Sequence, residues 1–461
     1  MSLNSISPID GRYHKSTSIL SRVFSERGLM RYRVMVEGEY LIALSELKIK
    51  LRKLSDREKK IIRTLFDLTD EDAQIISDIE QKGYKNIKAT DHDVKAVEYF
   101  MKDKLEDTTL KDILEWIHFG LTSEDTNNLS YGLMLRDGTE ILILKLEEII
   151  REFNKLTKEH ANLPILARTH GQPASPTTFG KEFKIFSSRL ERQVNNLKKQ
   201  EILCKLNGAT GNYNAQVIAF PNIDWFKFTK TFIAQLNKTG SETLRLEPNL
   251  FTTQIESHDS YAEIFDNLKR INTILLDFNQ DMWRYISDEW IIQKPTEGTV
   301  GSSTMPHKIN PIKFENSEGN LGIANALFEF FGRKLSISRL QRDLSDSTVQ
   351  RNFGTAFGHS LIAYEYLLKG LNKVSVNKNK IIEVLNNHPE IIAEAIQTIL
   401  RREGAEMPYE KLKDFTRGKQ VTLEDIHNFI NSLKISEKVK KELFKITPGN
   451  YIGLASKLAS K

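Results

Sequence analysis

The most distinctive chemical pattern in the sequence is a loop in which two serines precede a lysine. Ser302 and Ser303 follow Gly301, and Lys308 lies six residues after Ser302. A serine hydroxyl is a weak base or nucleophile, but a nearby cation and free backbone N–H groups can stabilise its anion. This loop offers Lys308 and the amides of both serines, so it is a candidate catalytic loop.

Two further polar segments carry residue types suited to proton transfer or ligand binding. The segment 163–180 contains His170, and histidine is the side chain that ordinarily gains or loses a proton near neutral pH. The segment 119–132 is rich in hydroxyl and carboxyl groups. Glycine and proline punctuate these segments and the serine-containing segment 297–311, so we predict three loops. Loops on a rigid scaffold commonly carry catalytic side chains, which makes these the candidate functional segments.

Long amphipathic helices are predicted to hold these loops in place. In 261–292 the apolar positions alternate spacings of four and three, the pattern of a helix packed in a bundle. Similar patterns at 142–156 and 183–197 predict two more such helices. Proline-free tracts at 9–163 and 312–388 also favour long helices. We therefore predict an all-α fold with a long-helix bundle core.

The length of 461 residues exceeds the size at which one hydrophobic core stops growing. We expect a helical amino-terminal domain at 1–111, a central long-helix bundle at 112–365 and a helical carboxy-terminal domain at 366–461.

Composition and motifs exclude several classes of function. The balance of 66 basic and 61 acidic residues does not favour a nucleic-acid partner. No apolar run has the length of a membrane span and no secretory signal is recognised, so we expect a soluble, cytoplasmic protein. The single cysteine, Cys204, excludes internal disulfides and is expected to be a buried thiol on a helix. The absence of GxxxxGK[ST], GxGxxG and HExxH motifs leaves ATP, NAD and catalytic zinc without support.

The serine loop also carries a family resemblance. Its sequence, GSSTMPHKINP, resembles the GSSxMPxKxNP sequence of the fumarase and aspartase superfamily, and His307 is similar to the residue found there in adenylosuccinate lyases. Fumarases tend to have glycine at this position and argininosuccinate lyases glutamine. The strings SPIDGRY, HDVKAVEYF, HFGLTSED, RTHGQPASPTT, TTQIESHD and QRDLSDSTVQRN resemble the long bacterial form of adenylosuccinate lyase. The resemblance covers nearly the whole chain.

The resemblance implies a β-elimination that needs no cofactor and no metal. Ser302 falls on the family's general base and His170 on its general acid, with Ser303 as the alternative base. The implied reactions release fumarate from adenylosuccinate, giving AMP, and from the succinylated aminoimidazole carboxamide ribotide.

The resemblance also implies a set of substrate-binding residues. Arginines and lysine would bind the phosphate and carboxylates of the nucleotide substrate. Asp91 departs from the family pattern, which has a neutral or basic residue there, and its charge would weaken anion binding unless it points away. The implied binding residues are Arg12, Tyr13, Asp91, His92, Asp93, Thr122, Ser123, Gln254, Lys308, Asn310, Asn316, Arg342, Ser347 and Arg351.

Assembly follows from the predicted helix length. A helical stretch of about 30 residues, which spans on the order of 45 Å, separates Ser123 from His170. Successive loops of an up-and-down bundle lie at opposite ends, so we expect different chains to supply these two residues. The resemblance implies a homotetramer with sites shared between subunits, and no membrane partner.

Two other functions stay open. One is another fumarate-releasing lyase of the superfamily, such as argininosuccinate lyase. The other is a helical scaffold that has lost its chemistry, which the presence of both His170 and Ser302 argues against.

Overall fold

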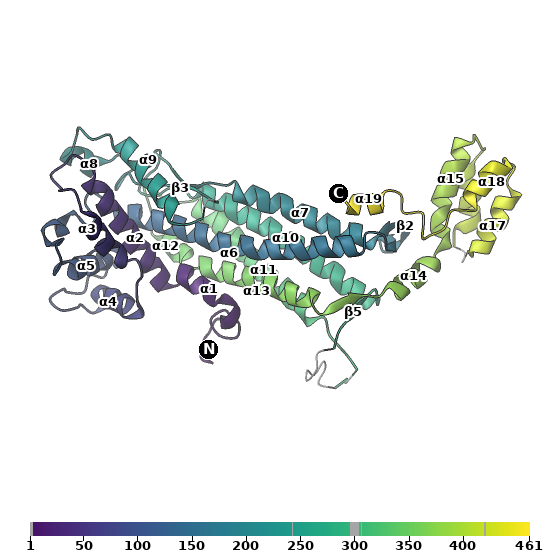
Figure 1. The fold of residues 1–461 in the computed structure, drawn as a ribbon, viewed down its shortest axis with the longest axis horizontal. Coiled ribbons are helices and arrows are strands. Elements are labelled where there is room, and N and C mark those ends of the chain that lie inside the picture. Colours follow the sequence, from purple (N-terminus) through teal and green to yellow (C-terminus); the bar gives the residue numbers. More distant parts are fainter. Residues whose placement is uncertain (1–2, 242, 296–303, 306, 419–420) are drawn as a thin grey trace. The chain divides into compact units, whose positions relative to one another are not determined.

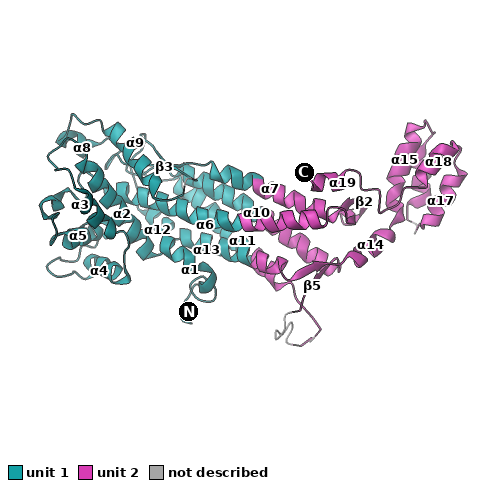
Figure 2. Ribbon diagram, viewed as in Figure 1, with its two compact units in different colours: residues 1–146, 192–273, 319–365 teal, residues 147–191, 274–318, 366–461 magenta. Residues whose placement is uncertain are grey.

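The computed structural model describes residues 3–241, 243–295, 304–305, 307–418 and 421–461 (Figure 1). Contacts divide the chain into two compact units, coloured separately in Figure 2. Unit 1 comprises residues 1–146, 192–273 and 319–365, and unit 2 comprises residues 147–191, 274–318 and 366–461. The three-domain division stays a prediction.

The described residues are mostly helical, which confirms the predicted all-α fold with a long-helix core. The elements that lie wholly in unit 1 are α1 (His14–Phe24), α2 (Glu26–Ser45), α3 (Asp56–Thr64), α4 (Asp70–Gln81), α5 (Asp93–Leu105), β3 (Ile202–Cys204), α8 (Asn214–Ala219), α9 (Trp225–Leu236), β4 (Leu246–Pro248) and α12 (Ser345–Gln350). Short 3₁₀ helices occupy Lys111–Trp116 and Asn237–Thr239.

The elements that lie wholly in unit 2 are β1 (Pro164–Thr169), β2 (Gln172–Thr178), β5 (Ile291–Gln293), β6 (Val374–Val376), α14 (Lys378–Asn386), α15 (Ala393–Arg402), α16 (Pro408–Thr416), α17 (Leu423–Ser432), α18 (Glu437–Leu443) and α19 (Ala455–Ala459), with a 3₁₀ helix at Pro389–Ile392. Five long helices contribute residues to both units: α6 (Ser123–Glu159), α7 (Phe179–Lys198), α10 (Asp259–Ser287), α11 (Ile312–Leu335) and α13 (Phe353–Leu371).

The short strands form three two-stranded sheets. Strands β1 and β2 pair antiparallel, β3 and β4 parallel, and β5 and β6 antiparallel. Cys204 belongs to β3, so its predicted helical setting is wrong, whereas its predicted burial is confirmed. No helix within the described residues combines the length and apolar character needed to cross a membrane.

The long helices form where the apolar periodicity predicted them, but their ends differ. Helix α10 stops at Ser287, five residues before the predicted end. Glu289 has a left-handed backbone conformation, and its N–H donates to the carbonyl of Ile286. The N–H of Trp290 donates to the carbonyl of Tyr285. These are the two bonds of a Schellman motif, and the stacked rings of Tyr285 and Trp290 supply its apolar contact. The usual glycine is absent, so the sequence lacked the stop signal.

Ring packing in each unit shows how the helices form a core. In unit 1, Phe265 of α10 contacts Phe328 and Phe331 of α11 and Phe353 of α13. In unit 2, Phe278 of α10 contacts rings on α6 and α7. Aromatic pairs of this kind stabilise a core beyond the burial of their area.

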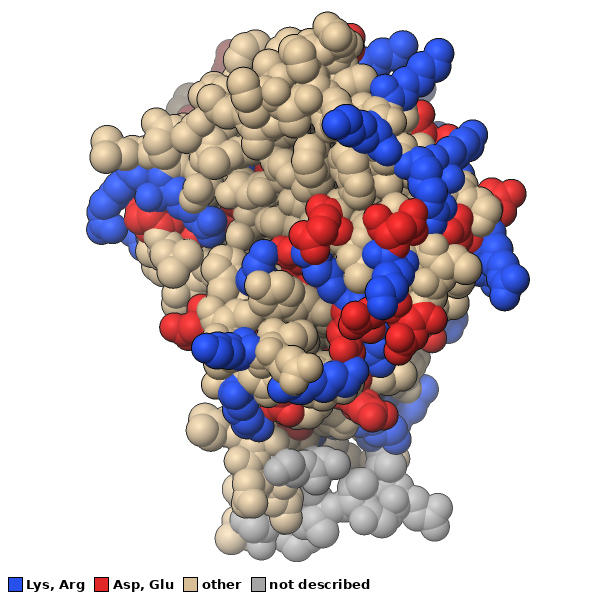
Figure 3. Space-filling view, turned by 90° about the vertical axis from the view of Figure 1, so that its left-hand side faces the viewer, with Lys and Arg blue, Asp and Glu red and all other residues tan. Residues whose placement is uncertain are grey.

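Basic and acidic side chains are intermingled on the face seen in Figure 3. Within unit 1, ion pairs join Arg27 to Asp70, Arg52 to Asp112, and Lys104 to Asp72. Such mixing on this face presents no continuous basic surface to a polyanion.

Gly180 tests the packing of unit 2. A β-carbon at this position would lie 2.4 Å from the carbonyl oxygen of Thr157 and 2.6 Å from the nitrogen of Ala161. Alanine favours a helix by about 1 kcal/mol over glycine, but overpacking against backbone costs roughly 1–3 kcal/mol or more. We expect Gly180→Ala to lower the midpoint of thermal unfolding.

Gly449→Ala is the matched control, because its nearest neighbouring atom would be 4.0 Å away. Equal unfolding midpoints for the two variants would contradict the packing argument.

Candidate active site

Helix α6 begins at one of the candidate segments. The predicted loop 119–132 is helical from Ser123 onward, so the loop prediction is wrong for most of its length. The N–H of Thr122 donates to a carboxylate oxygen of Asp125 at 2.9 Å. This is one half of a capping box, and the Thr122-x-x-Asp125 spacing was a sequence signal for the helix start.

Asp125 also ties the start of α6 to the segment that follows β3. Its carboxylate accepts from the Lys205 ammonium at 2.6 Å and from the backbone N–H of Asn207 at 3.1 Å and Gly208 at 3.2 Å. Asp125 and Lys205 have no exposed side-chain surface. A buried ion pair with this many additional hydrogen bonds fixes the position of Thr122 and Ser123.

A second buried contact fixes the residues just before α6. His118 Nδ1 lies 2.6 Å from a carboxylate oxygen of Glu37, and the Thr126 hydroxyl donates to the same oxygen at 2.6 Å. Burial alone would lower the pKa of the His118 imidazole, but Glu37 outweighs it and the pKa is raised. This favours a charged pair that holds the 118–126 segment against α2.

The structure brings His92 to Ser123. His92 caps α5, and its Nδ1 accepts the backbone N–H of Lys95 at 3.3 Å. The ring proton of the neutral imidazole therefore lies on Nε2, which can donate to the Ser123 hydroxyl oxygen at 3.3 Å. Two predicted ligand contacts from distant parts of the sequence thus lie side by side in unit 1.

Asp93 joins the site to Arg351. Its carboxylate pairs with Arg33 at 2.7 Å and with Arg351 at 2.8 Å. Burial alone would raise the pKa of the Asp93 carboxyl, but the two guanidinium groups outweigh it and the pKa is lowered. The distance from Asp93 to His92 Nδ1 is 3.9 Å, longer than a hydrogen bond. Arg351 also pairs with Glu26.

Asp91 lies just before the cap of α5. Its side chain is exposed and its backbone is left-handed, with φ of 47°. Aspartate is among the residues that adopt this conformation most readily. The local role of Asp91 is therefore to turn the chain into α5.

Arg342 approaches α6 from the segment before α12. Its guanidinium lies 3.0 Å from Glu124 and 3.5 Å from Asp346. Ser347 follows Asp346 and donates its N–H to that side chain at 2.7 Å. The N–H of Gln254 donates to the carbonyl of Gln341 at 3.3 Å, beside a hollow of about 510 Å³ lined in part by Thr253, Ile255 and Leu340.

Arg12 and Tyr13 precede α1, and Arg12 is exposed. The other predicted site residues belong to unit 2. Lys308 is exposed and Asn310 half-buried in the segment before α11, while Asn316 lies in the first turns of that helix. Ser302 and Ser303 lie outside the described residues.

His170 lies at the tip of a β-hairpin, so the predicted loop 163–180 is also wrong. Thr169 pairs with Gln172, which leaves His170 and Gly171 as a two-residue turn with φ of 54° and 75°. Positive φ at both positions identifies a type I′ turn. Each strand of an isolated hairpin has a free edge, where Pro173 and Pro176 are tolerated. His170 is exposed in this turn.

The second strand of this hairpin is anchored within unit 2. Ser175 of β2 donates to Glu394 of α15, and the Tyr451 hydroxyl donates to the same carboxylate at 2.9 Å. Burial and the neighbouring Glu394 raise the pKa of the Tyr451 phenol to about 12, so the phenol remains a donor at neutral pH. These contacts connect the strands that carry His170 to the carboxy-terminal segment.

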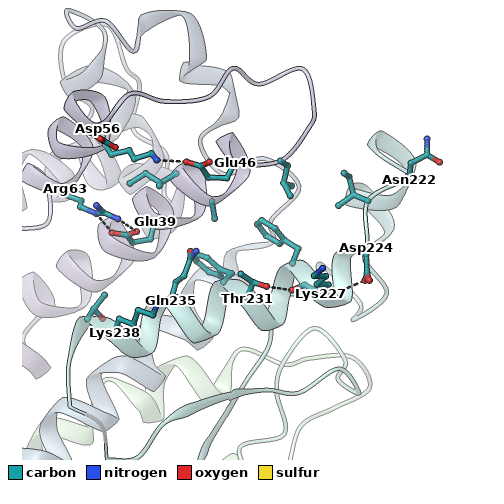
Figure 4. A pocket seen from close by; sticks show the side chains of 18 residues that line it. Glu39, Glu46, Asp56, Arg63, Asn222, Asp224, Lys227, Thr231, Gln235 and Lys238 are labelled. Carbon is teal, nitrogen blue, oxygen red and sulfur yellow. Dashed lines mark hydrogen bonds and ion pairs between the residues drawn. The ribbon is translucent and has the colours of Figure 1, made fainter.

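A larger pocket of unit 1, about 920 Å³, includes none of the predicted site residues in its lining. It lies between α2, α3 and α9, as Figure 4 shows. Its walls carry ion pairs that are already formed, Arg63 with Glu39 at 2.7 Å and Lys59 with Glu46. We therefore do not assign the reaction to this pocket.

The buried charged partners Arg33, Glu37, Glu124, Asp125 and Lys205 were not predicted from the sequence. Single charged residues give no warning that they will be buried, since most of them are exposed. Only the capping-box spacing of Asp125 was visible beforehand.

The ion pair of Asp125 and Lys205 generates a stability prediction. Lys205→Met leaves a buried carboxylate without its cation, which costs roughly 3–5 kcal/mol. We expect a lower thermal unfolding midpoint for this variant. The double variant Asp125→Asn/Lys205→Met removes both charges and should recover part of the loss. If the double variant were less stable than Lys205→Met alone, the buried charge would not be the cause.

Comparisons with known proteins find relatives over the whole chain. The family described as Lyase matches residues 11–325, and the one described as Adenylosuccinate lyase C-terminal matches residues 338–452. The protein named Adenylosuccinate lyase from Haemophilus influenzae is 46% identical over 100% of this chain and 98% of its own length. Proteins of the same name from Escherichia coli (strain K12) and Dictyostelium discoideum are 46% and 47% identical, each over 98% of this chain and 97% of their own lengths.

Solved structures agree at the level of the fold. A fumarate lyase from Mesorhizobium sp. BNC1 superposes with a TM-score of 0.74 at 16% identity, covering 96% of each chain. The 3-carboxy-cis,cis-muconate lactonizing enzyme from Pseudomonas putida superposes with a TM-score of 0.72 at 18% identity, covering 96% of this chain and 95% of that one. With this shared fold and full-length relatives at 46–47% identity, the chain belongs to the adenylosuccinate lyase family.

Proposed function

We propose that this protein is a carbon–nitrogen lyase that releases fumarate from adenylosuccinate, giving AMP, and from the succinylated aminoimidazole carboxamide ribotide. The observation that carries the proposal is the identity of 46–47% over 98–100% of the chain to relatives named adenylosuccinate lyase. These relatives disfavour argininosuccinate lyase as the activity. The protein is proposed to be cytoplasmic and to act in purine nucleotide synthesis.

The proposed reaction is a β-elimination carried out by Ser302 and His170. Ser302 takes the proton from the carbon beside a succinyl carboxylate, and negative charge spreads into that carboxylate. The electron pair then forms the double bond of fumarate as the carbon–nitrogen bond breaks. His170, as imidazolium, gives its proton to the departing nitrogen. The exposed position of His170 at a hairpin tip supports this role.

The polar cluster at the start of α6 is proposed to bind the nucleotide. Thr122, Ser123 and His92 would donate hydrogen bonds to it, and Arg351 and Arg342 would pair with its anionic groups. Lys308, Asn310 and Asn316 would complete the binding residues from unit 2. The support comes from the contacts within unit 1 that bring Ser123, His92, Asp93 and Arg351 together.

The assembly is proposed to be a homotetramer with shared sites. Helix α6 has 37 residues, so its ends lie about 55 Å apart. Ser123 begins this helix and His170 follows its other end in the sequence. We therefore propose that different chains supply these two residues to one nucleotide. Closed symmetric assembly is the usual arrangement of such oligomers.

An exposed stripe of α11 in unit 1 supports contact with a second copy. Ile323 is 49% and Phe330 42% exposed, with Ala326 exposed between them. A β-carbon at Gly319 or Gly322 would meet nothing within 4 Å, so no neighbour within the described chain explains these glycines. Small and apolar residues on one helix face allow another helix to approach closely.

The first functional prediction concerns the acid and the base. Ser302→Ala and His170→Ala should each lower kcat at least roughly 10²-fold, because a positioned acid or base contributes about that much. Fumarate release, followed by ultraviolet absorbance with each candidate substrate, measures the effect. Ser303→Ala is the matched control and should keep most of the activity. If either purified, folded variant kept more than half of the wild-type kcat, that residue would have no place in the mechanism.

The second functional prediction concerns assembly. The double variant Ile323→Glu/Phe330→Glu places charges on the α11 stripe and should reduce the mass measured by light scattering, with loss of activity. Lys50→Glu changes an exposed charge elsewhere in unit 1 and should leave the mass unchanged. An active wild-type protein of monomeric mass would rule out the shared site.

Mixing tests whether the chains share sites. Co-refolding Ser302→Ala chains with His170→Ala chains should create some intact sites, so part of the activity should return. Verified mixed oligomers without activity would place both residues on one chain.

A further inference from the structure

Glu124 is a buried carboxylate next to the proposed nucleotide site. It follows Ser123 in the first turn of α6, and its side chain is 1% exposed. Its charged partner is the Arg342 guanidinium at 3.0 Å, in a contact that lacks hydrogen-bond geometry. Neither oxygen of Glu124 has a hydrogen-bond donor among the described residues. A buried ionised carboxylate normally has such donors, so this one is poorly stabilised in its charged form.

Arg342 is shared between two acids. The Asp346 carboxylate also lies near Arg342, at 3.5 Å, and is 6% exposed, while Arg342 itself is 13% exposed. One positive charge therefore faces two negative charges when both acids are ionised. A phosphate dianion that paired with Arg342 would bring further negative charge to the same place. In a site shielded from water this repulsion is strong, and protonation of one acid would relieve it.

The other ionisable groups around Glu124 do not supply the missing positive charge. Lys205 is already paired with Asp125. Tyr131 and Tyr261 are phenols whose pKa values burial raises, so they are neutral. His258, near Asp346, has its pKa lowered to about 4 by burial and is neutral as well.

Glu124 is therefore the group best placed to accept a proton. Burial raises the pKa of its carboxyl to about 7, although Arg342 acts in the opposite direction. Near neutral pH the Glu124 carboxyl can therefore gain or lose a proton when another charged group binds nearby. An anion beside Arg342 raises the proton affinity of Glu124 further.

We infer that Glu124 takes up a proton when the phosphate of the nucleotide pairs with Arg342, so that Arg342 is transferred from a carboxylate to the ligand. Glu124 acts through Arg342 and is a positioning residue. The inference rests on the proposed function, because it takes Arg342 as a phosphate ligand. The binding step balances as one proton taken from solution, which forms an O–H bond on Glu124.

Calorimetry of AMP binding to the intact protein tests this inference. The second pKa of a phosphate ester is about 6, so AMP is already a dianion near pH 8 and releases no proton of its own. Titrations in two buffers of different ionisation enthalpy give the number of protons bound. We expect uptake of up to about one proton per AMP, and a Kd that weakens by up to about tenfold between about pH 7.5 and 8.5.

The variant Glu124→Gln should abolish the uptake and flatten the pH dependence of Kd. Glu256→Gln is the matched control, because Glu256 is also buried and has a raised pKa but pairs with Asn249 instead of Arg342. It should keep the uptake. Glu124→Met provides a second neutral replacement if the glutamine variant does not fold.

Each outcome decides the matter. AMP binding without proton uptake by the wild-type protein would overturn the inference, as would uptake that persists in a neutral Glu124 variant. Loss of uptake in Glu256→Gln would assign the proton elsewhere and overturn it too. Failure of the wild-type protein to bind AMP at all would overturn the proposed function together with this inference.

Discussion

The ion pair between Asp125 and Lys205 sets where helix α6 begins, and the polar cluster of unit 1 depends on that position. The carboxylate of Asp125 accepts from the Thr122 N–H within its own helix start and from Lys205, Asn207 and Gly208 of a segment about eighty residues later in the chain. Because neither charged side chain reaches solvent, each requires the other to remain in place. The positions of Thr122, Ser123 and Glu124 at the start of α6 are therefore fixed.

Elsewhere in unit 1, buried charge pairs orient residues that are proposed to bind the nucleotide. Glu37 holds the segment before α6 through His118, and Arg33 shares Asp93 with Arg351. Buried pairs are not by themselves a strong source of stability, since removing charges from water costs about as much as their attraction returns. These pairs fix orientation instead, because a guanidinium or imidazole group with a fixed partner holds its remaining donors in one direction. Arg342 contacts both Glu124 and Asp346, so an anion bound to Arg342 would add negative charge next to two carboxylates.

Unit 2 positions its candidate acid by a different device. A type I′ turn needs positive φ at two successive residues, and His170 with Gly171 satisfies this while leaving the imidazole exposed. The strands behind the turn are held by the carboxylate of Glu394, which receives bonds from Ser175 and Tyr451. A short hairpin is marginal alone, so these contacts to the carboxy-terminal segment keep its tip in place.

Apolar periodicity in the sequence determined the helical fold, because residues such as Ile264, Leu268 and Phe278 recur at the spacing of one helix face and must be buried there. Sequence strings that resemble a known family indicated His170 and Ser302 as candidates and also indicated the family itself. The full-length relatives confirm the family. Only the tertiary structure revealed the hairpin around His170, because its proline-containing strands lack a clear alternation of apolar and polar residues. Only the tertiary structure revealed the end of α10 as well, because Glu289 occupies the position where glycine is usual. It also decided the partners of Asp125, Glu124 and Asp93. Charge pairing between residues far apart in sequence depends on how helices pack, and local propensity carries no information about it.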